Sequence, residues 1–426
     1  MKKNVLVFPC GSEIALEVYR AVNKSTHFNL IGASSCDDHG KFVFENYIDN
    51  VPFITDENFI SSMCRIVKDN NIDAVYPAMD AVIEKLKSNE DKLGCKVIAP
   101  NTEITRLCLS KSETYKRLAN IIRVPKLYKS ISEVNNYPVF TKPDIGYGSR
   151  GAKKCLNADD LKNQIELYPT SIICEYLPGE EYTVDCFTNN KGELLCALSR
   201  VRSRIMNGIS VNTKPVIDDG EFIALANKIN KEIDFNGAWF FQVKRDENND
   251  LVLMEIASRF GGSSSLFRAK GVNFALMSLY NAFDIPVSII ENDYQVEMDR
   301  ALDNKYKIDI NYSEVFVDFD DCIYLEKKFV NEQLIAFLYK CRNRNIKLSL
   351  LSKHDDVALK PLDTLLKELR IEQLFDRIIH IDVNEQKSDY IDNKDAIFID
   401  DSFAERKFIK EKCGIPVFSV DMVEVL

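Results

Sequence analysis

The sequence lacks several features that would assign it to common functional classes. No stretch approaches 18 consecutive apolar residues, so a membrane-spanning helix is not expected. There is no excess of positive charge, and the net charge of −10 argues against a nucleic-acid surface. The 12 cysteines show no CxxC spacing, which favours reduced thiols in the cytosol over disulfides or zinc. The 4 histidines lie far apart, so each is expected to be solvated or to pack.

The length and composition of the sequence are typical of a globular, multidomain protein. The 426 residues, 46% apolar and 28% charged, predict two to four domains. The basic start is followed by an apolar run of only about five residues, which indicates a first strand and not a signal peptide. Composition divides the chain into an α/β domain at 1–104, an α+β region at 105–300, a polar linker at 301–312 and a second α/β domain at 313–426.

The strongest local signal lies near the C-terminus. The apolar run 314–317 ends at Asp318 and Asp320, and the run 396–399 ends at Asp400 and Asp401. Such runs are typical of buried parallel strands, whose carboxyl ends meet at the ligand-binding edge of a sheet. Converging carboxylates favour Mg²⁺ between them, and one of them can act as a nucleophile on phosphorus. The alternative is a set of solvated acids at strand ends.

A second group of chemical residues lies in the middle of the chain. Lys142 ends an apolar strand and precedes Gly146, Gly148 and Gly151, which together match GxGxxG. We reject a dinucleotide fingerprint because a helix must follow the third glycine, whereas residues 152–156 predict a short strand. A glycine-rich hairpin over phosphates, with Lys142 as their point charge, fits better.

Further polar residues follow on predicted hairpins. One hairpin, formed by residues 239–243 and 251–259, can place Gln242 and Glu255 on one face, with Arg259 just beyond. An alternating strand would point Arg200, Arg202 and Arg204 to one face, where they either bind a carboxylate or phosphate or form an exposed charged surface. The serines at 263–265 either line an acyl site or belong to a flexible loop.

The order of these residues resembles the ATP-grasp superfamily over about residues 1–300. The resemblance implies two α+β lobes that grip ATP, preceded by a small α/β domain. Lys111, Lys142 and Gly148 would lie at the phosphates, Glu175 and the Leu177 backbone at the adenine, and Glu181 at the ribose. Gln242 and Glu255 would hold Mg²⁺, which Mn²⁺ could replace, and Arg259 would steady the transferring phosphoryl group. The family activates a carboxylate as an acyl phosphate, which an amine then captures.

One position departs from that family. The usual pattern Glu-x-Asn-x-Arg is replaced here by Glu255, Ala257 and Arg259. Because alanine cannot ligate a metal, a second Mg²⁺ is absent, held by water, or helped by Ser258.

Residues 313–426 resemble the haloacid dehalogenase (HAD) superfamily, with a Rossmann-like α/β fold. Asp318 would be the nucleophile and Asp320 the general acid/base; Ser352 would hold the phosphoryl oxygen and Lys387 would neutralise it. Mg²⁺ would be bound by Asp318, Asp320, Asp400 and Asp401. Cys322 stands where threonine is common. The stretches around Ser352 and Asp400 are closer to the branch that loads glyceryl groups onto carrier proteins. Roughly thirty residues separate successive motifs, too few for a cap domain, so the site should be open.

Together the resemblances imply a bifunctional cytoplasmic enzyme, an ATP-dependent carboxylate–amine ligase fused to an uncapped phosphatase. Its partners would be a small-molecule carboxylate and an amine, phosphorylated or linked to a nucleotide sugar, in polysaccharide or small-molecule biosynthesis, and a homodimer is compatible with this. Two alternatives stay open. The grasp domain could be a small-molecule kinase, and the HAD domain could be a phosphotransferase or a non-catalytic docking module.

Overall fold

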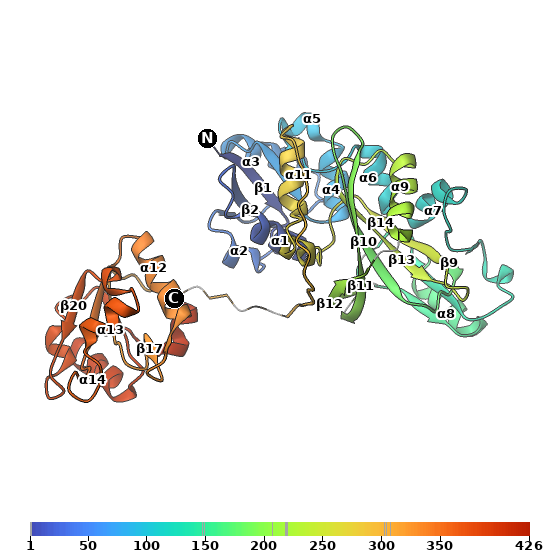
Figure 1. The fold of residues 1–426 in the computed structure, drawn as a ribbon. Helices are drawn as coiled ribbons and strands as arrows, with labels where there is room; N and C mark the ends of the chain where they lie inside the picture. The colour runs from blue at the N-terminus through green and yellow to red at the C-terminus, as the bar shows by residue number, and fades with distance from the viewer. Residues whose placement is uncertain are drawn as a thin grey trace. The chain divides into compact units, whose positions relative to one another are not determined.

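The protein forms two compact units in a computed structural model, Met1–Asp303 and Asn304–Leu426 (Figure 1). The structure describes residues 2–146, 148, 150–206, 208–217, 220–301, 303, 305–306 and 308–426. Within these ranges no helix is both long enough and apolar enough to cross a bilayer. The 12 cysteines all lie in the described part of the chain and are free thiols.

The first unit begins with a five-stranded parallel sheet in the order β3-β2-β1-β4-β5. Its strands are β1 (Lys3–Phe8), β2 (Phe28–Ala33), β3 (Tyr47–Ile48), β4 (Ala74–Pro77) and β5 (Lys96–Val97). The helices of this part are α1 (Glu13–Val22), α2 (Gly40–Val43), α3 (Phe59–Asp69), α4 (Asp80–Lys87) and α5 (Glu90–Leu93). The strand order is that of the doubly wound sheet expected for residues 1–104.

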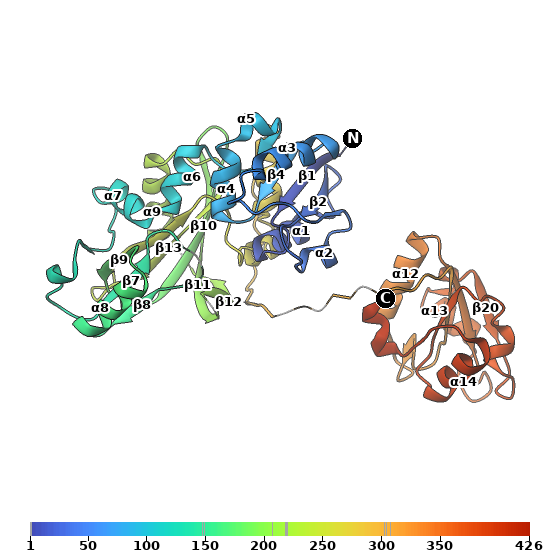
Figure 2. The ribbon, with the colours of Figure 1, turned by 180° about the vertical axis from the view of Figure 1, so that it is seen from behind.

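Two antiparallel sheets follow. After α6 (Thr102–Leu109) and α7 (Lys111–Leu118), a four-stranded sheet has the order β6-β9-β7-β8, with α8 (Ala158–Leu167) beside it (Figure 2). Its strands are β6 (Leu127–Tyr128), β7 (Val139–Pro143), β8 (Lys153–Cys155) and β9 (Ser171–Glu175), and a short 3-10 helix spans Ile131–Glu133. Since the strand β8, and not a helix, follows Gly151, rejecting a dinucleotide fingerprint is confirmed.

The larger sheet has six strands in the order β14-β13-β10-β11-β12-β15. They are β10 (Glu181–Thr188), β11 (Leu194–Met206), β12 (Ile209–Pro215), β13 (Gly237–Arg245), β14 (Leu251–Ala257) and β15 (Met298–Asp299). Three helices accompany them, α9 (Glu221–Glu232), α10 (Ser265–Ala269) and α11 (Phe274–Ala282). The two antiparallel sheets are the lobes between which the first candidate site lies.

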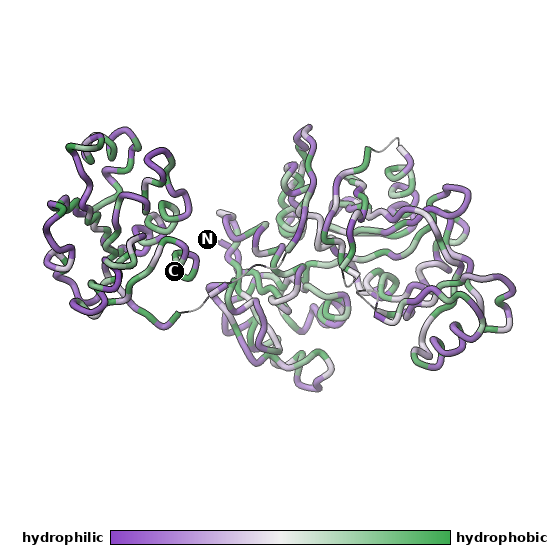
Figure 3. Tube along the Cα trace, turned by 90° about the horizontal axis from the view of Figure 1, so that it is seen from below, coloured by the Kyte–Doolittle hydropathy of each residue, from purple (hydrophilic) through white to green (hydrophobic). Residues whose placement is uncertain are grey.

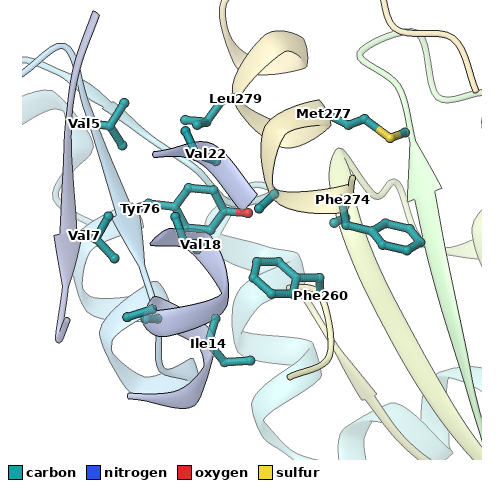
Figure 4. Packing of buried hydrophobic residues seen from close by; sticks show 14 of the residues in the cluster. Val5, Val7, Ile14, Val18, Val22, Tyr76, Phe260, Phe274, Met277 and Leu279 are labelled. Carbon is teal, nitrogen blue, oxygen red and sulfur yellow. The ribbon is translucent and has the colours of Figure 1, made fainter. Parts of the chain in front are cut away.

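One hydrophobic core joins the parallel sheet to the larger lobe of the first unit. Val5 and Val18, from β1 and α1, belong to the same buried cluster as Phe274 and Leu279 of α11, and Phe260 lies among them (Figure 4). Each such side chain contributes about 1.5–3 kcal/mol when fully buried. This packing holds the carboxyl end of β1 against the segment that follows β14.

The second unit is a five-stranded parallel sheet in the order β20-β19-β16-β21-β22. Its strands are β16 (Glu314–Val317), β19 (Lys347–Ser352), β20 (Arg377–His380), β21 (Ala396–Ile399) and β22 (Val417–Phe418), and its helices are α12 (Glu332–Asn343), α13 (Leu362–Glu368) and α14 (Phe403–Cys413). Three 3-10 helices span Glu372–Leu374, Lys387–Tyr390 and Val420–Val425. Hydrophobic and hydrophilic stretches alternate along the chain in both units (Figure 3).

Two details of the second unit were not anticipated. A small hairpin, β17 (Tyr324–Leu325) with β18 (Phe329–Val330), lies between Asp320 and α12. Ile310 and Tyr312, in the segment expected to be a linker, are partly buried against the core of this unit. The described residues between Asp320 and Ser352 otherwise hold one helix and one strand, as the spacing predicted.

Candidate active sites

The first unit contains a cleft with an empty volume of about 1000 Å³. Its lining includes all the residues expected at the nucleotide and at the grasp-site metal, namely Lys111, Lys142, Gly148, Glu175, Leu177, Glu181, Gln242 and Glu255. They come from α7, from both antiparallel sheets and from the loops between strands. Residues separated by more than a hundred positions in the sequence therefore meet in one cleft.

Two buried lysines mark one wall of this cleft. Ser110 caps α7 by accepting a hydrogen bond from the Glu113 backbone N–H, which places Lys111 in the first turn of the helix. The carboxylate of Asp144, at the start of the glycine loop, accepts hydrogen bonds from the Ser110 hydroxyl and the Ser112 backbone N–H. Lys142 donates to the Met254 carbonyl at 2.9 Å. The sequence reading missed Asp144, which joins this helix to the loop.

Two cations so close together have an electrostatic cost. Burial lowers the pKa of Lys111, Glu255 opposes that change, and the neighbouring ammonium of Lys142 adds to it. Lys111 and Lys142 are 9% and 8% exposed. A pair of largely desolvated ammonium groups is suited to an anion that lies between or beside them.

The register of the larger sheet places further polar residues at the cleft. Thr183 of β10 is paired with Gln242 of β13, which is paired with Glu255 of β14. Because directly paired residues share a face, the expected neighbourhood of Gln242 and Glu255 is confirmed. On the other side of Thr183, Arg200 of β11 completes the row. One row of the sheet thus presents oxygen ligands near one end and a guanidinium at the other.

Arg202 lies two residues beyond Arg200 on β11. Its guanidinium donates to Glu181, to the side-chain carbonyl of Gln242 at 3.0 Å, and to the backbone carbonyl of Gly208 at 2.8 Å. It therefore connects two cleft residues to the β11–β12 turn. At that turn a Cβ on Gly208 would come within 2.4 Å of the backbone of Gly148, so the turn and the glycine loop meet closely.

Glu175 and Leu177, the residues predicted to contact adenine, lie at the end of β9 and just after it. The Glu175 carboxylate accepts from the Lys126 backbone N–H and from Arg123, each at 3.0 Å. The side chain of Glu175 thus joins β9 to the segment that precedes β6, and Glu175, Tyr176 and Leu177 all line the cleft. Lys154 lies over the ring of Tyr176, 4.0 Å from its centroid.

Arg259 is not among the residues that line this cleft. Its guanidinium makes two hydrogen bonds of 2.8 Å to the carboxylate of Asp80, at the start of α4. The same arginine lines a second cavity, with an empty volume of about 640 Å³. The resemblance implies a role for Arg259 at a phosphoryl group, whereas in this structure the partner of its guanidinium is Asp80.

The three arginines of β11 do not act as one row. Arg200 is buried and donates to Asp185 at 2.6 Å. The register shifts between Arg202 and Arg204, which interrupts the expected alternation, and Arg204 pairs with Asp299. A β-bulge of this kind leaves no clear trace in sequence. Farther along, Ser263 is buried and donates to the Ser210 carbonyl at 2.8 Å.

In the second unit, Lys387 links the two acids at the centre of the sheet. Its ammonium lies 3.0 Å from an oxygen of Asp318 and 2.6 Å from an oxygen of Asp400. Burial raises the pKa of the Asp318 carboxyl, the lysine opposes that rise, and Asp400 adds to it. Burial alone would lower the pKa of Lys387, but the two carboxylates raise it above its usual value. The lysine therefore stays a cation.

The potential metal ligands differ in part from those predicted. Within the described part of the chain, oxygens of Asp318 and Asp401 and the sulfur of Cys322 lie within 4.8 Å of one another. The Asp400 carboxylate instead bonds Lys387 and the Ser402 backbone N–H. Asp318 and Asp401 are therefore candidate ligands for a divalent cation, with a sulfur where the resemblance leads one to expect threonine.

Asp320 points away from that group. Its two oxygens lie 3.0 and 2.8 Å from Nδ1 of His354, a buried histidine that sequence reasoning assigned to solvent or packing. Ser352, at the end of β19, is fully buried, and its hydroxyl has no hydrogen-bond partner among the described residues. The resemblance implies that this hydroxyl would hold a phosphoryl oxygen.

Comparison with known proteins addresses the first unit. Residues 168–305 match the family described as "ATP-grasp in the biosynthetic pathway with Ter operon". A D-alanine–D-alanine ligase from Fusobacterium nucleatum is 25% identical over 186 residues, which are 40% of this chain and 64% of that relative. The chain thus spans less than two thirds of the length of this curated relative.

Solved structures agree at the level of the fold. A biotin carboxylase from Campylobacter jejuni in a β-γ-ATP complex has a TM-score of 0.58 at 18% identity, covering 68% of this chain and 74% of that one. An N5-carboxyaminoimidazole synthetase from Staphylococcus aureus, complexed with ADP, has a TM-score of 0.57 at 17% identity, covering 68% and 81%. The family match and these likenesses support an ATP-grasp-like fold within a mixed α/β multidomain chain.

Proposed function

We propose that the first unit is an ATP-dependent carboxylate–amine ligase that works through an acyl phosphate. The observation that carries this proposal is the cleft, which is lined by the buried cations Lys111 and Lys142 together with Gln242 and Glu255. Buried ammonium groups suit a triphosphate, and paired oxygen ligands suit Mg²⁺. The relatives of this fold that bind ATP or ADP, and the ligase among the curated relatives, support the same activity.

The proposed chemistry has two steps. A carboxylate oxygen of the first substrate attacks the γ-phosphorus of ATP, and ADP leaves. The amine nitrogen of the second substrate then attacks the acyl carbon, phosphate leaves with the electrons of the C–O bond, and the nitrogen loses a proton. Lys111 and Lys142 stabilise charge that develops on the phosphates, since fixed cations in a shielded cleft need no reorganisation.

Mg²⁺ would neutralise the phosphate oxygens in this site. Glu255 and Gln242 fit it as oxygen ligands, because the sheet register pairs them side by side. Ala257 provides no ligand, so we propose one protein-bound metal centred on Glu255.

An ADP-release screen over pairs of carboxylates and amines tests the ligase. ADP should form only when the carboxylate is present together with the amine, or together with another nucleophile that takes the place of the amine. The rival activity is that of a small-molecule kinase. It would give ADP and a stable phosphorylated product when no amine is present.

Replacing Lys142 by alanine should abolish ATP-dependent ligation and weaken ATP binding by about tenfold or more, roughly 1.4 kcal/mol per tenfold. The reason is the loss of a buried cation in the cleft wall. Calorimetry with ATP measures the effect. Lys153→Ala, an exposed lysine of the neighbouring strand β8 outside the cleft lining, serves as the control and should bind normally. Unchanged affinity in Lys142→Ala would count decisively against this placement of the nucleotide.

The β11–β12 turn should also matter for ATP. Gly208 and Gly192 both have a positive φ, +77° and +80°, so alanine costs each about 1–2 kcal/mol of backbone strain. Only at Gly208 does a Cβ approach the glycine loop at Gly148, whereas at Gly192 the nearest atom is 4.0 Å away. We therefore expect Gly208→Ala to raise the Kd for ATP, while Gly192→Ala lowers stability alone. Equal Kd values in the two variants would show that the contact is irrelevant to binding.

A second activity is proposed for the second unit, hydrolysis of a phosphomonoester. The specific observation in its favour is the buried group of Asp318, Lys387 and Asp400, with the unpartnered hydroxyl of Ser352 at the end of the neighbouring strand β19. Mg²⁺ held by Asp318 and Asp401 would let a carboxylate approach a phosphate without severe repulsion.

In the proposed hydrolysis, an oxygen of Asp318 attacks phosphorus and the ester oxygen leaves with a proton from Asp320. Asp320 then takes a proton from water, whose oxygen attacks the phosphorus of the aspartyl phosphate, so that phosphate leaves and both Asp318 and protonated Asp320 are restored. If both activities serve one pathway, a phosphorylated amine or carboxylate would be ligated in the first unit and dephosphorylated in the second. A small-molecule conjugate in polysaccharide or secondary-metabolite tailoring would suit this scheme.

A further inference from the structure

The buried imidazole of His354 lies between the loop after β19 and the loop after β16. Its side chain is 1% exposed, and each ring nitrogen has one partner. Nε2 lies 2.8 Å from the Lys360 carbonyl oxygen, and Nδ1 lies 2.8 Å from the nearer oxygen of Asp320. A carbonyl oxygen only accepts hydrogen bonds, so Nε2 carries a hydrogen, and Nδ1 is the atom that faces Asp320.

The ring is held from further directions. It packs edge-on against Phe319, with ring centroids 5.6 Å apart and an interplanar angle of 85°. The backbone carbonyl of His354 accepts from Nε2 of His380 at 2.7 Å. Neither the ring nor the backbone of His354 can therefore turn without breaking a buried contact. A side chain fixed in this way fixes the group that it touches.

The group that it touches is chemically important. Asp320 lies two residues beyond Asp318, and its carboxylate is 32% exposed, so it can reach a bound ester while one edge is held by the histidine. Asp320 is not part of the group that gathers Asp318, Cys322 and Asp401. Its carboxylate is instead turned toward His354, which gives it one orientation relative to the attacking carboxylate.

We propose that His354 is a positioning residue of the second unit, whose Nδ1 aims the Asp320 carboxyl at the leaving oxygen of the phosphoester. This inference rests on the proposed phosphatase function. A packing role alone would be served by the bond from Nε2 to the Lys360 carbonyl, which ties the loop 353–361 together. The two roles use different ring nitrogens, and substitution can separate them.

The test uses the full-length protein and two substitutions that each keep one nitrogen. In His354→Asn the amide nitrogen stands roughly where Nδ1 stands, and in His354→Gln roughly where Nε2 stands. Each variant is assayed on p-nitrophenyl phosphate, which has a good leaving group, and on glycerol 3-phosphate, which has a poor one. Proton donation accelerates hydrolysis more when the leaving oxygen is more basic. An Asp320 carboxyl that is wrongly oriented should therefore lower the rate on glycerol 3-phosphate more than the rate on p-nitrophenyl phosphate.

His354→Gln should lower kcat on glycerol 3-phosphate by about 100-fold with little change in KM, and kcat on p-nitrophenyl phosphate only a few-fold. His354→Asn should stay within about fivefold of wild type on both esters. His380→Ala removes a bond to the same loop and serves as the control, since any loss there should be equal for the two esters.

The outcomes separate the two hypotheses. If the wild type hydrolyses neither ester, the proposed phosphatase function fails, and this inference fails with it. If the wild type is active and His354→Gln loses both esters equally, or loses neither, His354 does not position Asp320. Should His354→Gln fail to fold, His354→Asn decides: retained turnover of glycerol 3-phosphate supports the role of Nδ1, and its loss overturns it.

Discussion

Replacing Glu255 by glutamine should lower the rate of ADP formation by about 100-fold to 1000-fold. Glutamine has the same shape but no charge, and Ala257 provides no second ligand that could compensate. The register pairs Glu255 with Gln242, and this carboxylate is the negatively charged member of the pair that we propose as metal ligands. A coupled ADP assay at saturating ATP, with Mg²⁺ varied, measures the loss.

Two further variants sharpen this prediction. Glu247→Gln, on the exposed turn of the same β13–β14 hairpin, should leave the rate unchanged. Ala257→Asn, which restores the usual ligand of the family, should at most alter the Mg²⁺ dependence. A rise of about a hundredfold in Ala257→Asn would mean that the natural site is degenerate, and a wild-type rate in Glu255→Gln would remove the metal from this position.

Replacing Asp318 by asparagine should abolish phosphoester hydrolysis, with a loss of at least about 1000-fold, and leave ligation intact. The amide cannot attack phosphorus, while the shape and burial of the side chain are preserved. In the coupled scheme this variant accumulates a conjugate one phosphate heavier than the wild-type product, which mass spectrometry detects.

Asp321→Asn provides the matched control for that variant. Asp321 belongs to the same run of acids but is exposed, and its backbone φ of +52° suits asparagine as well as aspartate. Near-normal hydrolysis is expected. If Asp318→Asn and Asp321→Asn were equally active, hydrolysis would not proceed through Asp318, and a docking or transfer role for the unit would be preferred.

The parts of both sites that end strands could be predicted from sequence. Lys142 and Glu255 follow or end apolar runs, and acids placed at strand ends meet at one edge of a parallel sheet whatever the loops do. The exact pairing of Gln242 with Glu255 also depends on a register shift between Gln242 and Val243, which the alternation of the two hairpin strands does not predict. Local pattern therefore predicts the hairpin and its polar face, but not this register.

Contacts set by tertiary packing could not be predicted. Arg259 pairs with Asp80 across 179 positions, which depends on how the parallel sheet packs on the larger lobe. His354 meets Asp320 because two loops converge after neighbouring strands, and an isolated histidine carries no sign of such a partner. The bulge after Arg202 likewise redirects Arg204 without a glycine or proline to mark it.

The nucleotide product formed in the presence of hydroxylamine tests the central claim most directly. Hydroxylamine captures an acyl phosphate as a stable hydroxamate, so the identity of the natural amine is not needed. We expect ADP, phosphate and a hydroxamate in equal amounts, formed only with an accepted carboxylate and lost in Glu255→Gln. Release of AMP, or ADP with a stable phosphorylated product and no hydroxamate, would contradict the ligase.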